Sequence, residues 1–273
     1  MTSDAQPATR FVDTHTHLDD EAFETDRGVV ITNAISAGVG RMINVGYSPS
    51  RWATTAGLHA ATGHVSAMYG LHPQHANDWS DTVMSDLVSY LEVADTVAIG
   101  EIGLDYFRPF PARDLQQAVF RMQLSVAVDL RLPIVIHQRD AEGDLMTVLS
   151  EFATLPPVVL HSFDGTDHLA GYALERGWSI GIGGLATRRS SDTLRRVLAS
   201  IPVDALLLET DSPYLVPAGR RDRRNDPANI PLIATMLAPT WNVSTEELGE
   251  VTTKRAHDVF RFTASTVPMN EPS

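Results

Sequence analysis

Residues 133–161 read PIVIHQRDAEGDLMTVLSEFATLPPVVLH, and they contain the pattern that decides the fold. Two short apolar runs rich in β-branched residues stand on either side of a longer stretch with helical spacing. The same alternation continues toward both ends of the chain, and eight such runs occur, at residues 10–16, 41–45, 65–70, 96–101, 133–137, 158–161, 178–183 and 205–210. Eight β/α units in about 260 residues predict an α/β protein, a (β/α)8 TIM barrel. A doubly wound open sheet is the alternative.

The chain shows no internal boundary. No long linker rich in Pro, Gly or Ser divides it, so we expect a single domain over residues 11–262. Residues 1–10 are polar and lack the apolar centre of a secretory signal, so we expect a flexible leader and a cytoplasmic protein. Residues 263–273 lack apolar periodicity, and we expect a flexible tail there. No apolar run reaches about 18 residues, so no membrane span is expected.

Composition restricts the chemistry. The 273 residues are 43% hydrophobic and 20% charged, which is typical of a globular protein. The absence of cysteine excludes disulfides, thiolate zinc sites and a thiol nucleophile, so any metal must be held by nitrogen and oxygen. The net charge of −13 repels polyanions at long range, so a phosphate-containing substrate would need cations at the site itself.

The first strand places two imidazoles together. It reads FVDTHTH over residues 11–17, and side chains alternate across a strand, so Asp13, His15 and His17 share one face. In a barrel this face is the interior, and His17 would lie at the carboxyl-terminal rim, where barrel active sites form. A pair of hydrogen-bonded core histidines is the structural alternative, because the His-x-His spacing alone is common.

Other strands end in the same kind of residue. Apolar runs stop at Glu101, His137, His161 and Asp211, which defines a ring of ligand-type groups aimed at one point. Gathering carboxylates in a buried mouth is costly unless cations offset their repulsion. Four histidines and two carboxylates exceed the ligand set of one catalytic zinc, so two metals fit better, with Glu101 able to bridge them.

These residues resemble a known family. The chain resembles the TatD family of metal-dependent hydrolases and deoxyribonucleases, in the amidohydrolase superfamily of (β/α)8 barrels. The matching stretches are DTHTHL at 13–18, GLHP at 70–73, GEIGLDY at 100–106, LPIVIH at 132–137, HSFDG at 161–165 and LETDSPYL at 208–215. The resemblance implies a first metal at His15, His17 and Asp211, a second at His137 and His161, and Glu101 shared between them. Departures occur in the loop 219–227 and near Lys254, and they concern loop packing and substrate fit rather than the metal centre.

The site suggests a hydrolytic mechanism. We expect two divalent ions, Zn, Mn, Mg or Fe, to activate a water molecule, with Asp211 as the catalytic base. His72 is expected to donate to a substrate phosphate. We expect Arg139, together with Arg221 and Arg224 of the basic loop 219–224, to bind phosphate, although that loop is also compatible with a merely solvated face. Tyr106, Phe107 and Tyr214 flank ligand strands, where they either stack on bases or pack the rim.

Three functions are compatible with this pattern. The first is a metal-dependent DNase or phosphodiesterase that acts from an end, as an exonuclease, on DNA, with RNA or a small phosphodiester as alternatives. The second is hydrolysis of an amide, a lactone or an aminoacyl ester, for example as an aminoacyl-tRNA deacylase, because the same metal pair supports it. The third is a non-catalytic binding barrel. Nothing in the sequence indicates an obligate protein partner or a membrane.

Overall fold

A computed structural model describes residues 11–93, 95–221 and 223–262 of the chain. The predicted leader 1–10 and tail 263–273 lie outside the described residues. Each of the eight predicted runs overlaps one strand. They are β1 (Phe11–Thr16), β2 (Val39–Gly46), β3 (Val65–Tyr69), β4 (Thr96–Asp105), β5 (Ile134–Arg139), β6 (Val158–Leu160), β7 (Ser179–Ile182) and β8 (Leu206–Leu208).

The strands form one parallel sheet in sequence order, β1 to β8. A parallel bridge between Thr16 and Ser212 joins β1 to the segment after β8, and the amide of His17 donates to the carbonyl of Ser212 at 2.8 Å. These contacts close the sheet into a barrel, so the predicted (β/α)8 fold is confirmed and the open-sheet alternative is wrong.

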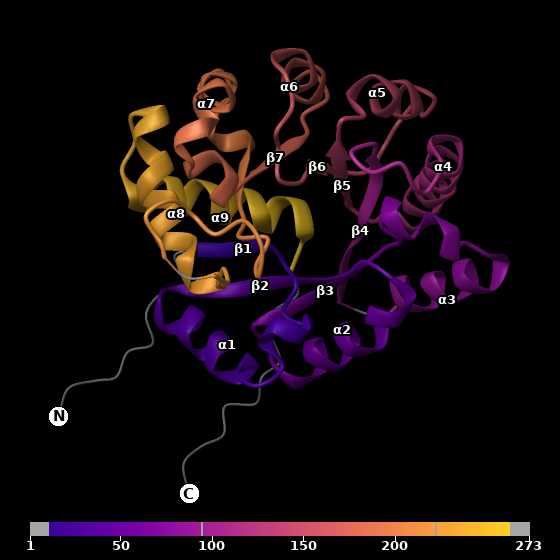
Figure 1. Ribbon diagram of the computed structural model, residues 1–273, viewed down its shortest axis with the longest axis horizontal. Helices are drawn as coiled ribbons and strands as arrows, with labels where there is room; N and C mark the ends of the chain where they lie inside the picture. The colour runs from indigo at the N-terminus through magenta and orange to yellow at the C-terminus, as the bar shows by residue number, and fades with distance from the viewer. Residues whose placement is uncertain (1–10, 94, 222, 263–273) are drawn as a thin grey trace, which may run out of the picture.

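Helices surround the strands (Figure 1). They are α1 (Arg27–Ser36), α2 (Pro49–Ala61), α3 (Asp81–Leu91), α4 (Arg113–Leu130), α5 (Glu142–Ser150), α6 (Asp167–Leu174), α7 (Asp192–Leu198), α8 (Ile230–Leu237) and α9 (Thr245–Phe260). Local chemistry sets several of their ends. The Ser80 and Ser244 side chains accept from backbone amides in the first turns of α3 and α9, whereas α4 ends where Arg131 takes a left-handed conformation. No helix among the described residues is both long and apolar enough to cross a membrane.

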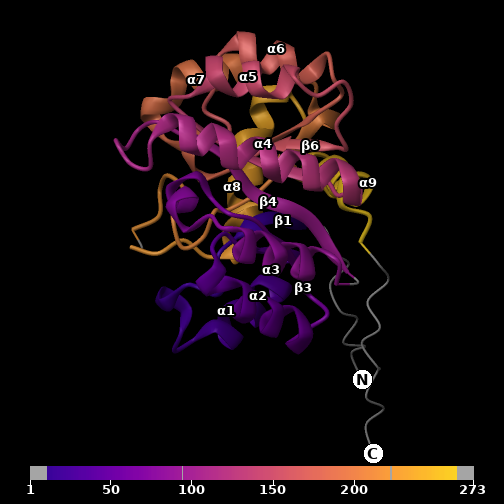
Figure 2. The ribbon, with the colours of Figure 1, turned by 90° about the vertical axis from the view of Figure 1, so that its right-hand side faces the viewer.

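The two ends of the barrel are built differently. A buried apolar cluster takes residues from seven strands, and α9 adds Ala256, Val259 and Phe260 to it. Since the C-terminal end of α9 lies beside the residues that begin β4, β5 and β6, this helix covers the amino-terminal end of the barrel. Figure 2 shows the barrel from the side, with the loops that follow β4 and β8 at the opposite end from the last turn of α9. The carboxyl-terminal end therefore stays available for a site.

Candidate metal centre

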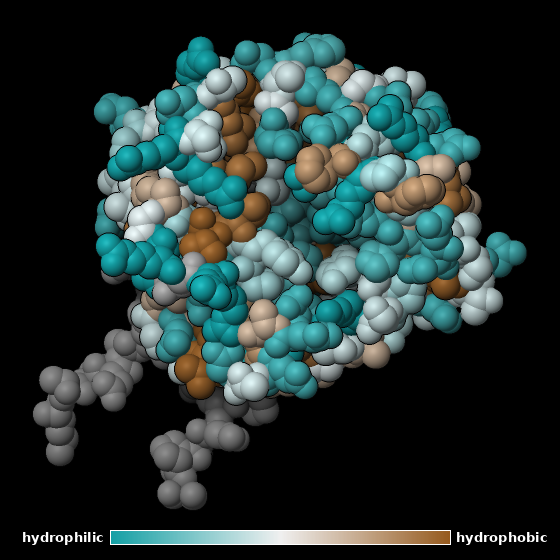
Figure 3. All heavy atoms as spheres, viewed as in Figure 1, coloured by the Kyte–Doolittle hydropathy of each residue, from teal (hydrophilic) through white to brown (hydrophobic). Residues whose placement is uncertain are grey.

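A cavity of about 560 Å³ opens at the carboxyl-terminal end of the barrel. Figure 3 looks onto this face, where hydrophilic side chains surround a hollow near the centre. Most of the residues predicted for the site line this cavity: His17, His72, Glu101, His137, Arg139, His161 and Asp211. His15 is fully buried beside it. The strand-end argument therefore placed these groups at one point, as barrel geometry requires.

His15, His17 and Asp211 form one group that could hold a metal ion, with one possible ligand atom from each within 4.8 Å of the others. The Nε2 atom of His17 lies 3.2 Å from Oδ1 of Asp211, and Nε2 of His15 lies 3.8 Å from the same oxygen. Asp211 has a φ of 56°, a left-handed conformation that Asp adopts more readily than most residues. Its amide donates to the carbonyl of His15 at 2.9 Å, which fixes the Asp211 backbone against β1.

Glu101 stands between the histidines, at 4% exposure. Its Oε1 atom lies 2.7 Å from Nδ1 of His137 and 3.6 Å from Nε2 of His161, whereas Oε2 lies 3.5 Å from Nε2 of His15. The two carboxylate oxygens thus face different imidazoles. This is the arrangement that a ligand shared between two ions needs.

Asp105 belongs to the site although strand-end reasoning missed it. His72, Asp105 and His137 form a third group of possible ligands. The Oδ2 atom of Asp105 accepts from Nε2 of Gln74 at 2.7 Å and lies 3.3 Å from Nε2 of His137. Because Nδ1 of His137 faces Glu101, Asp105 holds the other nitrogen of that ring and sets its orientation.

Two further buried acids support the ligands from behind. Asp13 accepts from the amide and the hydroxyl of Thr210, at 2.9 and 2.6 Å, and so fixes the residue before Asp211. Glu209 accepts from the amide of Ser162 at 2.6 Å and lies 3.0 Å from Nδ1 of His161. A Cβ atom at Gly181 would lie 2.3 Å from Glu209, so glycine at this position is what lets the acid approach.

Buried carboxylates and imidazoles shift one another's pKa values in this cluster. Burial opposes ionisation of Glu101, but the surrounding imidazoles outweigh it and hold the pKa of this carboxyl well below its usual range. Burial also opposes ionisation of Asp211, but the hydrogen bond with His17 outweighs it and holds the pKa of Asp211 below its usual value. Despite their own burial, His137 and His161 have pKa values raised to about 9 and about 10 by Glu101, Asp105 and Glu209. Glu101 and Asp211 are therefore charged at neutral pH, whereas burial raises the pKa of Asp13 to about 8.

Metal ions fit this set of side chains. The Nε2 atom of His15 is fully buried and forms no hydrogen bond to any described residue, although carboxylate oxygens of Glu101 and Asp211 lie within 4 Å of it. Buried polar atoms are rarely left without a partner, and a divalent ion between imidazole and carboxylate would satisfy this one. Histidine and carboxylate donors suit zinc, manganese or iron, and the groups of side chains around Glu101 and Asp211 are able to hold metal ions.

Of the three arginines expected to bind phosphate, Arg139, Arg221 and Arg224, one lines the cavity. Arg139 lines the cavity, and its guanidinium lies 3.7 Å from the ring centroid of Phe107. Arg224 instead donates to both carboxylate oxygens of Asp26, at 2.8 and 2.6 Å, and Arg221 is exposed on its loop. Neither of these two is among the described residues that line the cavity. Arg108 and Arg188, which the sequence argument did not single out, do line it.

Comparison with known proteins identifies the family. The model of the TatD-related DNase family matches residues 12–261. The chain belongs to the TatD-related DNase family. It is 33% identical over 251 residues to the uncharacterized metal-dependent hydrolase YabD of Bacillus subtilis, covering 92% of this chain and 98% of the relative. It is 36% identical over 253 residues to the 3'-5' ssDNA/RNA exonuclease TatD of Pantoea vagans, covering 90% and 97%.

A solved structure supports the same assignment. The crystal structure of YjjV, a TatD homolog from Escherichia coli, matches with a TM-score of 0.88 and 30% identity over 93% of this chain and 99% of that one. The resemblance that the strand-end motifs suggested is confirmed by these comparisons. This TatD-family protein is a metal-dependent hydrolase, with histidine, glutamate and aspartate groups at the barrel mouth that are able to hold the metal.

Proposed function

We propose that this TatD-family protein is a metal-dependent exonuclease that hydrolyses single-stranded DNA from the 3' end. One observation carries the proposal: Glu101, whose two carboxylate oxygens face His15 and His137, lies with Asp211 in a cavity that arginine and tyrosine side chains also line. The names of relatives such as the exonuclease of Pantoea vagans support DNA as the substrate and suggest RNA as a second one.

The protein residues divide the chemistry among them. Bound divalent cations supply Lewis acidity and lower the pKa of water, so that a nucleophile is available near neutral pH. We assign the ions to His15, His17 and Asp211 and to His137 and His161, with Glu101 shared. Asp211, at the cavity wall, accepts the proton of the attacking water and later returns it to the leaving oxygen.

His72 is suited to hold a phosphate oxygen. Its Nδ1 atom accepts from the amide of Gln74 at 3.1 Å, and burial lowers the pKa of His72 to about 3. The ring is therefore neutral, and its proton lies on Nε2. This nitrogen is 3.7 Å from Glu101, at the cavity, so it is placed to donate to a substrate oxygen beside the metal ligands.

The rim favours a single strand over a duplex. A cavity of about 560 Å³ lies within the range of sites for small ligands, so it accepts a terminal nucleotide rather than paired DNA. Tyr214 lines the cavity and is 49% exposed, and Phe107, which is 56% exposed, lies against Arg139 of the lining. Exposed aromatic rings bind unpaired bases by stacking. Arg108, Arg139 and Arg188 supply positive charge at the same rim. Arg221 and Arg224 remain predicted contacts to a strand that extends beyond the cavity.

The test is cleavage of a single-stranded oligonucleotide labelled at one end or the other. With metal-loaded protein, we expect EDTA-sensitive release of single nucleotides from the 3' end. Asp211→Asn should lower turnover at least about 100-fold, because a general base contributes about that much or more. Asp258→Asn, on an exposed face of α9, is the matched control and should leave the rate unchanged.

Other outcomes would redirect the proposal. Products from an aminoacyl ester, amide or lactone panel without any DNA cleavage would favour carbonyl chemistry. Cleavage that begins at the 5' end would contradict the proposed polarity. We also propose that the enzyme works in the cytoplasm without an obligate protein partner. Cell fractionation and activity of the purified chain alone test these two points.

A further inference from the structure

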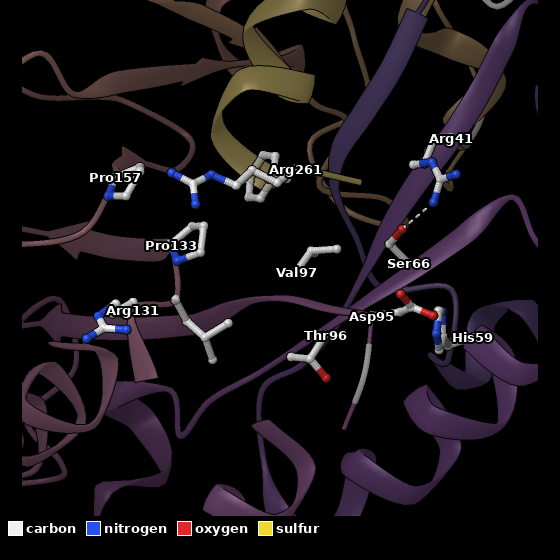
Figure 4. A pocket seen from close by; sticks show the side chains of 12 residues that line it. Arg41, His59, Ser66, Asp95, Thr96, Val97, Arg131, Pro133, Pro157 and Arg261 are labelled. Atoms are coloured by element: carbon white, nitrogen blue, oxygen red, sulfur yellow. Dashed lines mark hydrogen bonds between the residues drawn. The ribbon is translucent and has the colours of Figure 1, made fainter. Parts of the chain in front are cut away.

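A second cavity lies at the amino-terminal end of the barrel, on the opposite side from the metal centre. Its volume is about 190 Å³. The walls come from residues that begin β4, β5 and β6, from Arg41 and Ser66 on β2 and β3, and from Phe260 and Arg261 at the end of α9 (Figure 4). No residue of the metal centre contributes to this lining.

Positive charge dominates this second cavity. Arg41, Arg131 and Arg261 line it, against a single carboxylate, that of Asp95. In a protein with a net charge of −13, three guanidinium groups around one acid are a local reversal of sign. His59 also lines the cavity, but its Nδ1 atom is hydrogen-bonded to the carbonyl of Val65 at 2.9 Å and is therefore not available to a ligand.

Two of the three guanidinium groups are available. The side chains of Arg131 and Arg261 form no hydrogen bond or ion pair with the described residues. Both residues have a left-handed backbone, with φ values of 55° and 48°, immediately after α4 and α9. Figure 4 shows the guanidinium of Arg261 beside Pro133 and Pro157, and that of Arg131 below Pro133.

The third guanidinium is held in place. Nη1 of Arg41 donates to the hydroxyl of Ser66 at 2.9 Å, and the guanidinium lies 4.8 Å from the ring centroid of Phe262. Burial lowers the pKa of Arg41, and Asp95 only partly offsets this. A half-buried cation with one exposed carboxylate near it gains from a second anion.

Apart from Thr96, whose hydroxyl donates to the carbonyl of Tyr90 at 3.0 Å, the rest of the lining is apolar. Val97 and Phe260 are 6% and 3% exposed, and Leu132, Pro133 and Pro157 complete this side. A cavity of about 150 Å³ is known to accept benzene, so about 190 Å³ accommodates a ring of that size with one charged group. The combination of an apolar wall and free guanidinium groups selects for an amphipathic anion rather than for inorganic phosphate.

We propose that this cavity binds a small organic anion, with its carboxylate or phosphate group on Arg261, a compact apolar body against Val97 and Phe260, and Arg131 adding positive charge to the lining. This site is independent of the proposed nuclease activity, since none of its residues reaches the metal centre. Benzoate and phenyl phosphate are suitable probes for the two anion types, and benzyl alcohol is the neutral probe of similar size.

The experiment is calorimetric titration of the full-length, metal-loaded protein with each probe. We expect benzoate or phenyl phosphate to bind with a stoichiometry of one, and benzyl alcohol to bind at least about tenfold more weakly, since it lacks a charged acceptor. The double variant Arg131→Asn/Arg261→Asn should also reduce affinity about tenfold or more. Asparagine is chosen because it tolerates the left-handed backbone at both positions.

The controls separate this cavity from the metal centre. Arg189→Asn/Arg196→Asn removes the same charge elsewhere on the surface and should leave the affinity unchanged. Removing metal with a chelator should also leave it unchanged. The proposal is overturned if neither anion binds, if binding survives Arg131→Asn/Arg261→Asn, or if it disappears on chelation, which would place the probe at the metal ions. Circular dichroism of each variant checks that the fold is retained.

Discussion

Asp105 is the residue whose role differs most from what strand patterns indicate. It lies behind His137, and its two oxygens are fully used: Oδ1 accepts from the amide of Phe107 at 3.0 Å, and Oδ2 faces Gln74 and His137. A carboxylate in this position orients a ligand imidazole without having to touch the metal, and such residues tune metal affinity.

We predict that Asp105→Asn weakens binding of one of the two metals about 10- to 100-fold, because outer-shell changes in metal sites cost about that much. Metal content per chain, measured against free metal concentration, gives the affinity directly. Asp204→Asn, at an exposed position before β8, is the matched control. Unchanged metal affinity together with unchanged turnover would show that His137 is oriented by Glu101 alone.

Sequence could predict which side chains gather at the cavity because they end strands. His137, His161 and Asp211 follow short apolar runs, and parallel strands in a barrel bring such ends together. The strand-end argument did not identify Asp105 because β4 continues to residue 105, four residues beyond the expected end at Glu101. Arg108 and Arg188 reach the cavity from loops, whose paths depend on tertiary contacts that no local periodicity encodes. The partner of Arg224 is 198 residues away, which explains why its pairing with Asp26 was not foreseen.

At the scale of elements, α9 acts as the closing layer of the barrel. Phe260 is 3% exposed and packs with Val12, Val45 and Val135 from three strands. We predict that Phe260→Ala lowers the free energy of unfolding by about 3–5 kcal/mol, which is the usual cost of deleting a buried aromatic ring. Urea unfolding measures this loss.

The rate per folded molecule should stay unchanged in Phe260→Ala, because the metal centre lies at the other end of the barrel. Val29→Ala, at a position that is 60% exposed on α1, should alter the free energy of unfolding by less than about 0.5 kcal/mol. A Phe260 variant that keeps its stability would mean that α9 does not close the barrel interior.

The ion pair of Arg224 and Asp26 ties the loop after β8 to the start of α1. Hydrogen bonds from Arg224 hold the pKa of Asp26 below its usual value of 3.8. The stabilisation is therefore fully present above pH 3.8 and is lost as pH falls through the lowered pKa of the folded state. We predict that Arg224→Gln lowers Tm slightly at neutral pH and that the Tm difference from the wild type shrinks below pH 3.8. A Tm difference that stays constant with pH would assign the stabilisation to the packing of Arg224 over Phe23.

At the scale of the whole molecule, the net charge and the charges of the arginines at the cavity have opposite signs and act over different distances. The net charge of −13 repels a polyanion over long distances, but the Debye length is about 10 Å at 0.1 M salt, so this repulsion is largely screened above that concentration. The arginines at the cavity act at contact distance and are screened much less. Binding of single-stranded DNA should therefore depend on the few guanidinium groups that reach its phosphates.

The contrast between screened long-range repulsion and direct arginine–phosphate contacts predicts how cleavage depends on salt concentration. If Arg108, Arg139 and Arg188 each neutralise one phosphate, log kcat/KM should fall against log salt above 0.1 M with a slope of about −2, since single strands lose about 0.7 per contact. Replacing all three arginines by glutamine should bring the slope close to zero, whereas Arg121→Gln, on the exposed side of α4, should not change it. A wild-type slope near −3.5 would correspond to about five contacts and would add Arg221 and Arg224 to the strand path. A flat wild-type slope would contradict phosphate binding at this rim and leave recognition to the metal ions and the aromatic side chains.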